Sequence, residues 1–502
     1  MSDTDSLANE IVERAETLKS ARLNFEKTWQ EVSELVLPRK ADFSFYQTAG
    51  APRGRKLFET TAVNAAELLA AGMHGLMTNP SGKWFALTAK GGADGERAGR
   101  DRARWLENAE RVMRDEISRA AAGFATNIHE VYLDLAVLGT AGLYVGWNEN
   151  KDCLLFQSRF LGELFIEENA VGQIDTVYRV FKMSLSDIAK TWGVSALPES
   201  MRFQVGQGKG DVLSEIVHAV RPNVSGGTPC GVDKPVSSVY VLKIELHVLF
   251  SGGFEEMPLM IVRWSKATGE VYGRSPAVSV LPDIKMIQEM MKETIISAQL
   301  ANRPPLLVRD DDQFAPAATV PGGIIRYSGE PPKAFSSGAN SSVGLDIMNE
   351  IRERIRAAFF NDRLMSVGNV QMTATESLIR NEEKMRLMGP VAGRIQTELL
   401  DPMIDRVFGL LLRHGKIPLP PRGDTAEIGV EYVSPLAMMQ KRQEAQAVLR
   451  TLEASSPVVS LNPEAGKVFN AEEIVRQIGK MFGAPETAVR SAAEMKRMRE
   501  NE

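Results

Sequence analysis

The stretch from Tyr272 to Gly415 is the feature that most constrains the fold of this chain. Apolar residues recur at steps of three and four from Asp283 to Ala301, and again from Val343 to Phe360, which predicts two amphipathic helices. At a rise of about 1.5 Å per residue these helices are about 30 Å and about 27 Å long. Six prolines and the pair Gly322-Gly323 interrupt the sequence between them. Two helices of matched length around a compact insertion predict an antiparallel pair with the insertion at its far end.

The insertion and the loop after the second helix contrast in composition. Short apolar runs at Leu306–Arg309 and Ile324–Tyr327 predict two strands inside the insertion, which extends over residues 302–342. The segment from Asn361 to Gln371 is polar and contains no helical period. We therefore expect a loop over Asn361–Gln371, between the second amphipathic helix and the helical pattern that begins at Thr373.

A long helical pattern follows this loop. Thr373 and Glu376 have the spacing of a capping box, which predicts a well-defined helix start. The pattern continues to Gly415, a residue suited to the position just after a helix end. Gly389-Pro390 must kink this helix, and Pro402 predicts a second bend, because proline lacks the N–H that the helix needs.

The rest of the chain mixes helical and period-two patterns, which predicts an α+β fold that is predominantly helical. Helices are predicted over Leu7–Leu37, where Pro38 ends the pattern, and over Leu57–Met77, Arg100–Ala122, Asn127–Leu138, Ala437–Ala454 and Ala471–Met481. Strands are predicted over Trp84–Thr88, Gly142–Trp147, Leu154–Gln157, Glu163–Glu167, Ile174–Lys182, Val236–Phe250, Met260–Trp264 and Ile428–Val433. Gly252-Gly253 is expected to form a hairpin turn, and Ser184 with Asp187 to cap a short helix that ends at Trp192.

Charge and cysteine content limit the function classes. The 502-residue chain has a formal net charge of −5, whereas a tight DNA binder usually has a basic excess. The chain therefore either does not bind DNA or binds it weakly. No apolar run reaches about 18 residues, so no membrane span is predicted, and the acidic start does not look like a secretory signal. Cys153 and Cys230 alone make no disulfide framework, which favours a reducing compartment.

The motifs of common catalytic and cofactor sites are missing. There is no GxxxxGK[ST] loop, no GxGxxG after a strand, no CxxC and no GxSxG. The five histidines are far apart and form no HExxH: His74, His129, His218, His247 and His414. Asp310-Asp311-Asp312 reads as a solvated loop, although carboxylates at the tip of a ring could collect a cation. We therefore predict no catalytic residue, no bound cofactor and no metal site.

Several motifs together carry a family resemblance. They are WQEVSELVLPR from Trp29 to Arg39, RKLFE from Arg55 to Glu59, the run from Leu69 to Leu87 with PSGKWF, and TATE from Thr373 to Glu376 before Gly389-Pro390. In this order and spacing the chain resembles the head-to-tail connector, or portal, proteins of short-tailed bacteriophages, over about residues 10–490. The resemblance implies a ring subunit with a wing, a helical stem, a small α/β clip and a short helical crown.

The resemblance also divides the chain. It implies a wing over 1–271, a first stem helix over 272–301, a clip over 302–342, a second stem helix over 343–360, a tunnel loop over 361–372, a kinked long wing helix over 373–415, a wing strand and linker over 416–435, and a short helical crown with the C-terminal tail over 436–502.

Three groups of candidate site residues follow from this division. The tunnel loop would present to DNA Asn361, Asp362, Arg363, Leu364, Met365, Asn369 and Gln371. The clip would dock other proteins through Arg309, Asp310, Asp311 and Asp312. The stem carries charges that would either line the channel or join neighbouring subunits by salt bridges, with salt bridges slightly favoured: Lys285, Glu289, Lys292, Arg352 and Arg356. Arg363 is the one charge for which a position in the channel is favoured.

The family resemblance further implies partners. Portal proteins form rings of about twelve identical subunits around double-stranded DNA. They dock the large subunit of the terminase motor and then a tail adaptor protein, and they associate with major capsid and scaffolding proteins. The expected location is the capsid vertex of the virion, and the host cytoplasm during assembly. Channel walls that bound phosphates strongly would stall moving DNA, so a mildly acidic chain suits this role.

Two other functions stay open at the level of sequence. The first is another ring component of a phage, such as a tail adaptor or tube protein, although adaptors are usually much smaller. The second is an enzyme with a dispersed acidic site, for which Glu167-Glu168 or Glu382-Glu383 could be proposed. Both carboxylate pairs lie in ordinary solvated patterns, so a passive conduit is the favoured interpretation.

Overall fold

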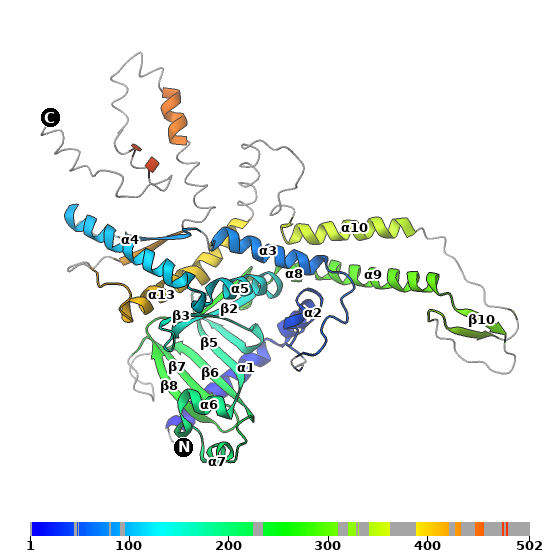
Figure 1. Cartoon of the computed structure of the whole chain (residues 1–502), viewed down its shortest axis with the longest axis horizontal. Helices are drawn as coiled ribbons and strands as arrows, with labels where there is room; N and C mark the ends of the chain where they lie inside the picture. The colour runs from blue at the N-terminus through cyan, green and yellow to red at the C-terminus, as the bar shows by residue number, and fades with distance from the viewer. Residues whose placement is uncertain are drawn as a thin grey trace.

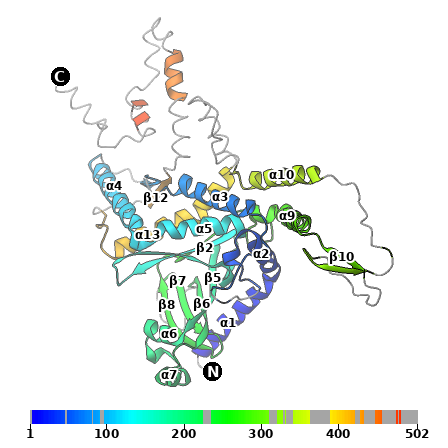
Figure 2. The same cartoon turned by 45° about the vertical axis from the view of Figure 1, so that its right-hand side comes forward.

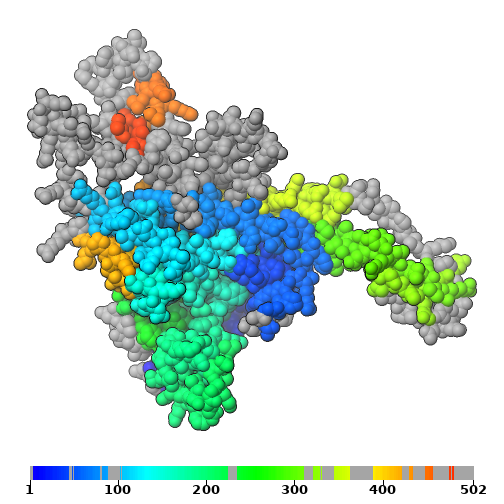
Figure 3. All heavy atoms as spheres, in the orientation of Figure 1, coloured from blue at the N-terminus to red at the C-terminus, as the bar shows by residue number. Residues whose placement is uncertain are grey.

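A computed structural model describes residues 3–44, 48, 50–79, 82–90, 96–223, 234–309, 320–327, 330, 341–361, 388–420, 427–432, 447–455, 474–475 and 478–479. Figures 1 and 2 show a body of sheets and helices from which two helices, α9 (Leu281–Asn302) and α10 (Ser341–Ala358), project together. In space-filling view this projection stands clear of the body (Figure 3). Within the described part of the chain, no helix is both long and apolar enough to cross a membrane.

The N-terminal helical pattern is divided into two helices. The sequence predicts one helix over Leu7–Leu37, whereas the structure has α1 (Asp3–Ala21) and α2 (Leu23–Val36). The chain bends at Arg22, whose φ of −97° and ψ of 4° are not helical. Arg22 is 2% exposed, and its guanidinium donates to the carbonyl oxygens of Leu161, Gly162 and Leu164. The helix therefore breaks at Arg22, because a buried guanidinium must find hydrogen-bond acceptors. Pro38 follows the end of α2, as predicted.

A five-stranded antiparallel sheet forms the lower part of the body in Figure 1. Its strand order is β4-β5-β6-β7-β8, with β4 (Leu164–Glu168), β5 (Ile174–Ser184), β6 (Leu213–Pro222), β7 (Val236–Leu242) and β8 (His247–Phe254). Val217 and Val241 pack with α1 on one face. Their neighbours Ile216 and Leu242 pack on the other face with α6 (Leu185–Trp192) and α7 (Glu199–Gly206). Successive strand residues thus bury both faces.

The hairpin predicted at Gly252-Gly253 is wrong. Gly252 and Gly253 lie inside β8, opposite Ser238 and Ser237 of β7. The turn falls between β7 and β8, where Leu246 has a φ of 51°, so the stretch predicted as one strand over Val236–Phe250 is two strands. The next strand, β9 (Leu259–Arg263), belongs to another sheet, whose order is β3-β2-β9. The sequence patterns also do not predict β6 or α7.

Most of the other predicted elements are confirmed. β2 (Thr140–Asn148) and β3 (Cys153–Arg159) form the second sheet with β9, and β1 (Phe85–Lys90) pairs with the distant β12 (Glu427–Tyr432). Above them lie α3 (Thr61–Met77), α4 (Glu96–Ser118) and α5 (Phe124–Leu138). Ser184 caps α6, since its hydroxyl accepts the N–H of Asp187 at 3.2 Å. These elements confirm the α+β fold class.

The long helix predicted over residues 373–415 is a regular α-helix in only part of its described residues. Residues 388–395 are helical, then the five residues Gln396–Leu400 form a π-helical turn, η5, before α13 (Asp401–Arg413). The turn precedes Pro402, which confirms a local irregularity there. After α13, Gly415 has a φ of 67°, and the N–H groups of Gly415 and Lys416 donate to Leu412 and Leu411. This is the predicted glycine termination of a helix.

Some predicted features fall outside the described residues. They are the capping box at Thr373 and Glu376, the segment before Gly389-Pro390, the clip residues 310–319 and 331–340, and most of the predicted crown. Of the helix predicted over Ala437–Ala454, residues 447–454 are described and are helical.

Candidate functional site

The projecting pair α9–α10 is the first candidate site, because the stem and clip are predicted there. The start of α9 lies beside the end of α10, since Asp283 and Arg354 are 3.5 Å apart, so the two helices run antiparallel. Their shared base is apolar and fully buried, with Ile284 and Ile287 from α9 against the main core that also contains Ile351 and Ile355. Beyond the base the described residues of α9 are half-buried or exposed.

At the far end of the pair lies a two-stranded parallel ribbon. β10 (Leu306–Arg309) and β11 (Ile324–Tyr327) have the bounds that the sequence predicts, and Arg309 is opposite Tyr327. Arg303-Pro304-Pro305 ends α9 as predicted, with Arg303 as the C-cap. Leu306 and Ile324 are more than half exposed. Of the predicted clip surface, Arg309 is exposed at the end of β10, while Asp310, Asp311 and Asp312 lie outside the described residues.

Hydrogen bonds at the base join the pair to the body. The side chain of Gln288 is 5% exposed. Its Oε1 accepts the main-chain N–H groups of Phe58 at 2.7 Å and of Glu59 at 2.9 Å, and its Nε2 donates to the Glu59 carbonyl oxygen at 2.6 Å. The Glu59 carboxylate accepts the N–H of Thr61 at 2.9 Å and the Nε of Arg352 at 3.3 Å. One segment before α3 thus holds both projecting helices.

The predicted stem charges have partners within the same chain. Lys285 pairs with Glu31 of α2, and Arg352 with Glu59 and with the side chain of Asn349. Lys292 pairs with Glu289 one turn away, and this hydrogen bond raises the pKa of Lys292. Arg356 is exposed near the end of α10. The contacts of Lys285 and Arg352 tie α9 and α10 to α2 and to the segment before α3, a role that the sequence interpretation does not include. Channel lining or contact between subunits stays a prediction for all five residues.

Asn361 requires a correction. Predicted to face DNA, it is 6% exposed. With its amide nitrogen turned toward the nearby acceptors, it donates to the carbonyl oxygens of Phe359 and of Ala65 in α3, both at 3.1 Å. Asn361 therefore anchors the end of α10 to α3, because a buried amide must find partners. The other predicted loop residues lie outside the described part of the chain: Asp362, Arg363, Leu364, Met365, Asn369 and Gln371.

A buried ion-pair network at the π-helical turn is a site that the sequence interpretation missed. Arg263 of β9 is 2% exposed and donates to Glu398 of η5, to Glu168 of β4 and to the carbonyl oxygens of Val271 and Gly172. Burial lowers the pKa of Arg263, but the two carboxylates outweigh burial and hold it above the usual value. Lys266 donates to Glu168 at 2.5 and 2.7 Å. The network therefore joins the three-stranded sheet, through β9, and the five-stranded sheet, through β4, to the helical segment that contains η5.

A sequence signal for this site does exist. Pro402 has no N–H, so the carbonyl of Glu398, four residues earlier, loses its normal helical donor. A π-helical turn accommodates the gap, and such turns often mark functional sites. The pairing with Arg263 is a contact across 135 residues and has no local signature.

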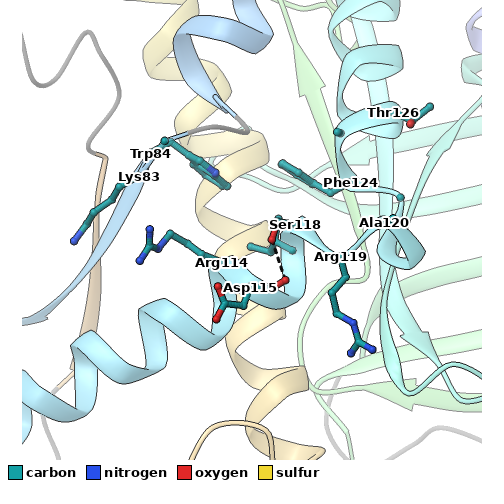
Figure 4. A pocket seen from close by; sticks show the side chains of 13 residues that line it. Lys83, Trp84, Arg114, Asp115, Ser118, Arg119, Ala120, Phe124 and Thr126 are labelled. Carbon is teal, nitrogen blue, oxygen red and sulfur yellow. Dashed lines mark hydrogen bonds between the residues drawn. The ribbon is translucent and has the colours of Figure 1, made fainter.

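A cavity of about 470 Å³ lies between α4, α5 and the segment before β1. Figure 4 shows Lys83 and Arg114 on one side and Arg119 on the other, with Asp115 and Ser118 between them. Lys83 pairs with Glu110 at 2.9 Å and Arg114 with the same carboxylate at 3.6 Å, while Arg119 pairs with Glu116 at 2.9 Å. Because every cation here already has a carboxylate partner, the cavity is a poor site for an anion.

Among the residues that the structure describes, no cluster suited to a metal ion occurs.

Comparison with known proteins identifies the family of this chain. Residues 8–489 match the family model of the bacteriophage head to tail connecting protein. The chain is 28% identical over 489 residues to a "Probable portal protein" of Bordetella phage BPP-1, covering 94% of this chain and 87% of the relative. It is 25% identical over 507 residues to a "Portal protein" of Salmonella phage epsilon15, covering 98% and 90%.

A solved structure titled "Virion of native gene transfer agent (GTA) particle" contains a chain that is similar over 85% of this chain and 96% of its own length, with 12% identity and a TM-score of 0.37. The assignment rests instead on the family match, which spans nearly the whole sequence. The protein therefore belongs to the family of bacteriophage head to tail connecting proteins, the phage portal proteins.

Proposed function

We propose that this chain assembles into a closed ring of about twelve identical subunits at one capsid vertex, where it forms the channel for double-stranded DNA. In this assembly α9 and α10 are the stem and the ribbon β10–β11 is part of the clip. The clip docks the large terminase subunit during packaging and then a tail adaptor protein. The loop at 362–370 meets the DNA, with Arg363 as its positive charge.

The observation that carries this proposal is the projecting pair of helices in a chain of this family. The pair exposes large apolar side chains along its length, among them Met286, Ile295, Leu345 and Ile347. A single chain gains nothing from exposing these side chains, whereas neighbouring subunits on either side in a ring would cover them. Apolar association between the stems therefore accounts for both the length and the composition of the projection.

The charge balance supports passage of DNA rather than capture. Lys285, Lys292 and Arg352 all have acidic partners in the same chain. Paired cations release few counterions when DNA approaches, so they add little affinity. A wall of this kind would let duplex DNA move in both directions. The proposed protein is a conduit with no catalytic step of its own, and the energy for packaging comes from the docked motor.

Electron microscopy of the purified chain tests the proposal directly. Negatively stained particles should be rings with a central opening, and native mass spectrometry should give a mass that is an integral multiple of 55.2 kDa. The double variant Ile295→Glu with Ile347→Glu places charge at two of these exposed apolar positions. This variant should lower ring yield without lowering the thermal midpoint of the subunit. A wild-type chain that stays monomeric at high concentration would refute the ring.

A further inference from the structure

We propose that Glu59 and Gln288 set the angle at which α9 and α10 leave the body, and that this angle selects the number of subunits at which the ring closes. The inference rests on the ring proposed above. It assigns to the buried Gln288 and the partly buried Glu59 a positioning role that is separate from the contacts between subunits.

The junction of these two residues lies where the helices leave the body. Gln288 is the last buried residue of α9 toward the tip, and every later residue of that helix is half-buried or exposed. On the returning helix, Met348 is the first residue described as buried. The 14 residues of α9 beyond Gln288 (289–302) extend about 21 Å at about 1.5 Å per residue. They form a lever whose direction is decided at the junction.

Glu59 connects three helices through its own polar groups. Its main-chain N–H donates to Gln288 of α9 at 2.9 Å, and its carbonyl oxygen accepts from the same side chain at 2.6 Å. Its carboxylate accepts from the N–H and the hydroxyl of Thr61, the first residue of α3, and from Arg352 of α10. The side chain of Arg352 thereby reaches the same carboxylate that caps α3. A tilt of α9 would disturb the bonds between Gln288 and Glu59, and a tilt of α10 would disturb the bond between Arg352 and Glu59.

These hydrogen bonds control direction in a way that the apolar contacts do not. Burial of Ile287 or Ile351 is non-directional, so the helices could slide or tilt slightly and still bury the same area. Hydrogen bonds weaken steeply as their angles deviate, and a buried amide left without partners is strongly unfavourable. The three bonds of Gln288 therefore favour one tilt and one rotation of α9 relative to α3.

Ring geometry turns this angle into a subunit number. In a closed ring the contacts between wings and the contacts between stems must obey the same rotation from one subunit to the next. That rotation is about 30° for about twelve subunits and about 28° for one more, a difference of about 2°. Such a change moves the end of the 21 Å lever by less than about 1 Å. A small loosening at Gln288 is therefore enough to admit a second ring size.

The test measures, for each variant, the number of subunits in the ring and the thermal stability of the protein. Gln288→Met keeps the length of the side chain and removes all three bonds, while Gln299→Met makes the same chemical change at an exposed position of α9. Native mass spectrometry and class averages from electron microscopy count the subunits, and thermal unfolding is measured in parallel. We expect one ring size for the wild type and for Gln299→Met. For Gln288→Met we expect at least two ring sizes, because the tilt of α9 is no longer fixed by its hydrogen bonds.

Glu59→Gln is a second variant in case Gln288→Met does not fold. It keeps an acceptor for Thr61, removes the charge that holds Arg352, and should also broaden the distribution of ring sizes. A variant that forms the wild-type ring size with only a lower thermal midpoint would overturn the inference and leave the ring intact as a proposal. Equal broadening by Gln299→Met would overturn it as well. If the wild type forms no ring, the proposed function itself fails.

Discussion

Arg263 holds Glu398 through its side chain and its main chain together. The main-chain N–H of Arg263 donates to Glu398 Oε2 at 2.9 Å, and its Nη2 donates to Oε1 at 2.6 Å. Because Glu398 lies in the π-helical turn just before Pro402, this pair fixes the irregular turn of the long helix to the edge strand β9. The Glu398 carboxylate thus accepts a main-chain N–H at the outer edge of β9, which would otherwise lack a partner in the sheet.

Breaking this pair should destabilise the subunit strongly. Glu398→Ala leaves the 2%-exposed Arg263 with one carboxylate fewer, which is expected to lower the free energy of unfolding by about 3 kcal/mol. The control is Glu270→Ala, which breaks the exposed pair of Glu270 with Arg274 and should lower it by about 0.5 kcal/mol. Urea unfolding followed by tryptophan fluorescence gives both values. Similar values for the two variants would show that burial of the pair does not matter.

Gly139 and Gly415 should respond differently to the same substitution. Both have a positive φ, 81° and 67°. A Cβ at Gly139 would lie 2.6–2.7 Å from main-chain atoms of residues 273–275, the segment that leads into α8 (Pro276–Ser279) and α9. At Gly415 it would meet nothing within 4 Å. Gly139→Ala should therefore lower stability by about 3 kcal/mol or prevent folding, and Gly415→Ala by about 1 kcal/mol. Differential scanning calorimetry of both variants checks the order. Equal losses of stability would mean that backbone crowding at Gly139 is unimportant.

His218 makes the stability of the five-stranded sheet depend on pH. Burial, followed by the nearby charges of Arg179 and Arg159, lowers the pKa of His218 from 6.5 to about 3. Below pH 6.5 the unfolded chain binds a proton that the folded chain excludes, so stability is fully present above pH 6.5 and is lost as pH falls toward 3. The slope from this one group is about 1.4 kcal/mol per pH unit.

The measurement is the unfolding midpoint of the wild type and of His218→Phe at several values between pH 7 and pH 4.5. His218 stacks on Tyr240 at 3.8 Å and contacts Ser238, so the variant is less stable at pH 7. We expect this difference to shrink as the pH falls. A constant difference would mean that His218 is protonated in the folded protein.

Deleting residues 362–370 should separate DNA handling from assembly. If these nine residues meet DNA, their removal leaves rings intact and lowers the amount of DNA packaged or retained, because the channel loses its inward projection. A matched deletion of nine residues between β6 and β7 in the sequence, 224–232, should leave DNA retention unchanged. Ring images and the DNA content of particles are the two measurements. Loss of rings in the first variant would show that the loop is structural.

Charge reversal tests the clip. If the proposed clip presents these carboxylates to a basic partner surface, changing Asp310, Asp311 and Asp312 to lysine should weaken binding of the motor or of the tail adaptor by about tenfold, because attraction becomes repulsion. The control reverses three exposed carboxylates far from the stem, Glu199, Asp211 and Glu245. Pull-down of purified partners at two salt concentrations measures the effect. Unchanged docking in the clip variant would remove the acidic run from the interface.

The elements with strong local signals were predictable. β10 and β11 have the predicted bounds, and α9 extends over Leu281–Asn302 where the sequence indicates Asp283–Ala301. The cap at Ser184 and the glycine termination at Gly415 also depend on neighbours within a few residues. Local periodicity and capping chemistry decide such features before any tertiary contact forms.

The features that were wrong or missed depend on distant partners. Arg22 breaks the N-terminal helix for carbonyl groups about 140 residues away, which no local pattern reveals. Gly252-Gly253 has the composition of a turn, yet pairing with β7 keeps both residues in a strand. Asn361 has the composition of a polar loop, but α3 lies beside it and buries it. In each case the tertiary environment overrides local preference.

By itself the sequence determined the order of elements, the two matched helices around a Pro/Gly-rich insertion, and the family. These follow from short-range periodicity and from motifs that keep their order along the chain. The tertiary structure alone decided how the pair is held, through Gln288 and Glu59 at its base and Asn361 against α3. It also decided the pairing of Arg263 with Glu398 at the π-helical turn. The physical reason is that buried polar groups must find partners wherever the chain brings them, and those partners lie far away in sequence.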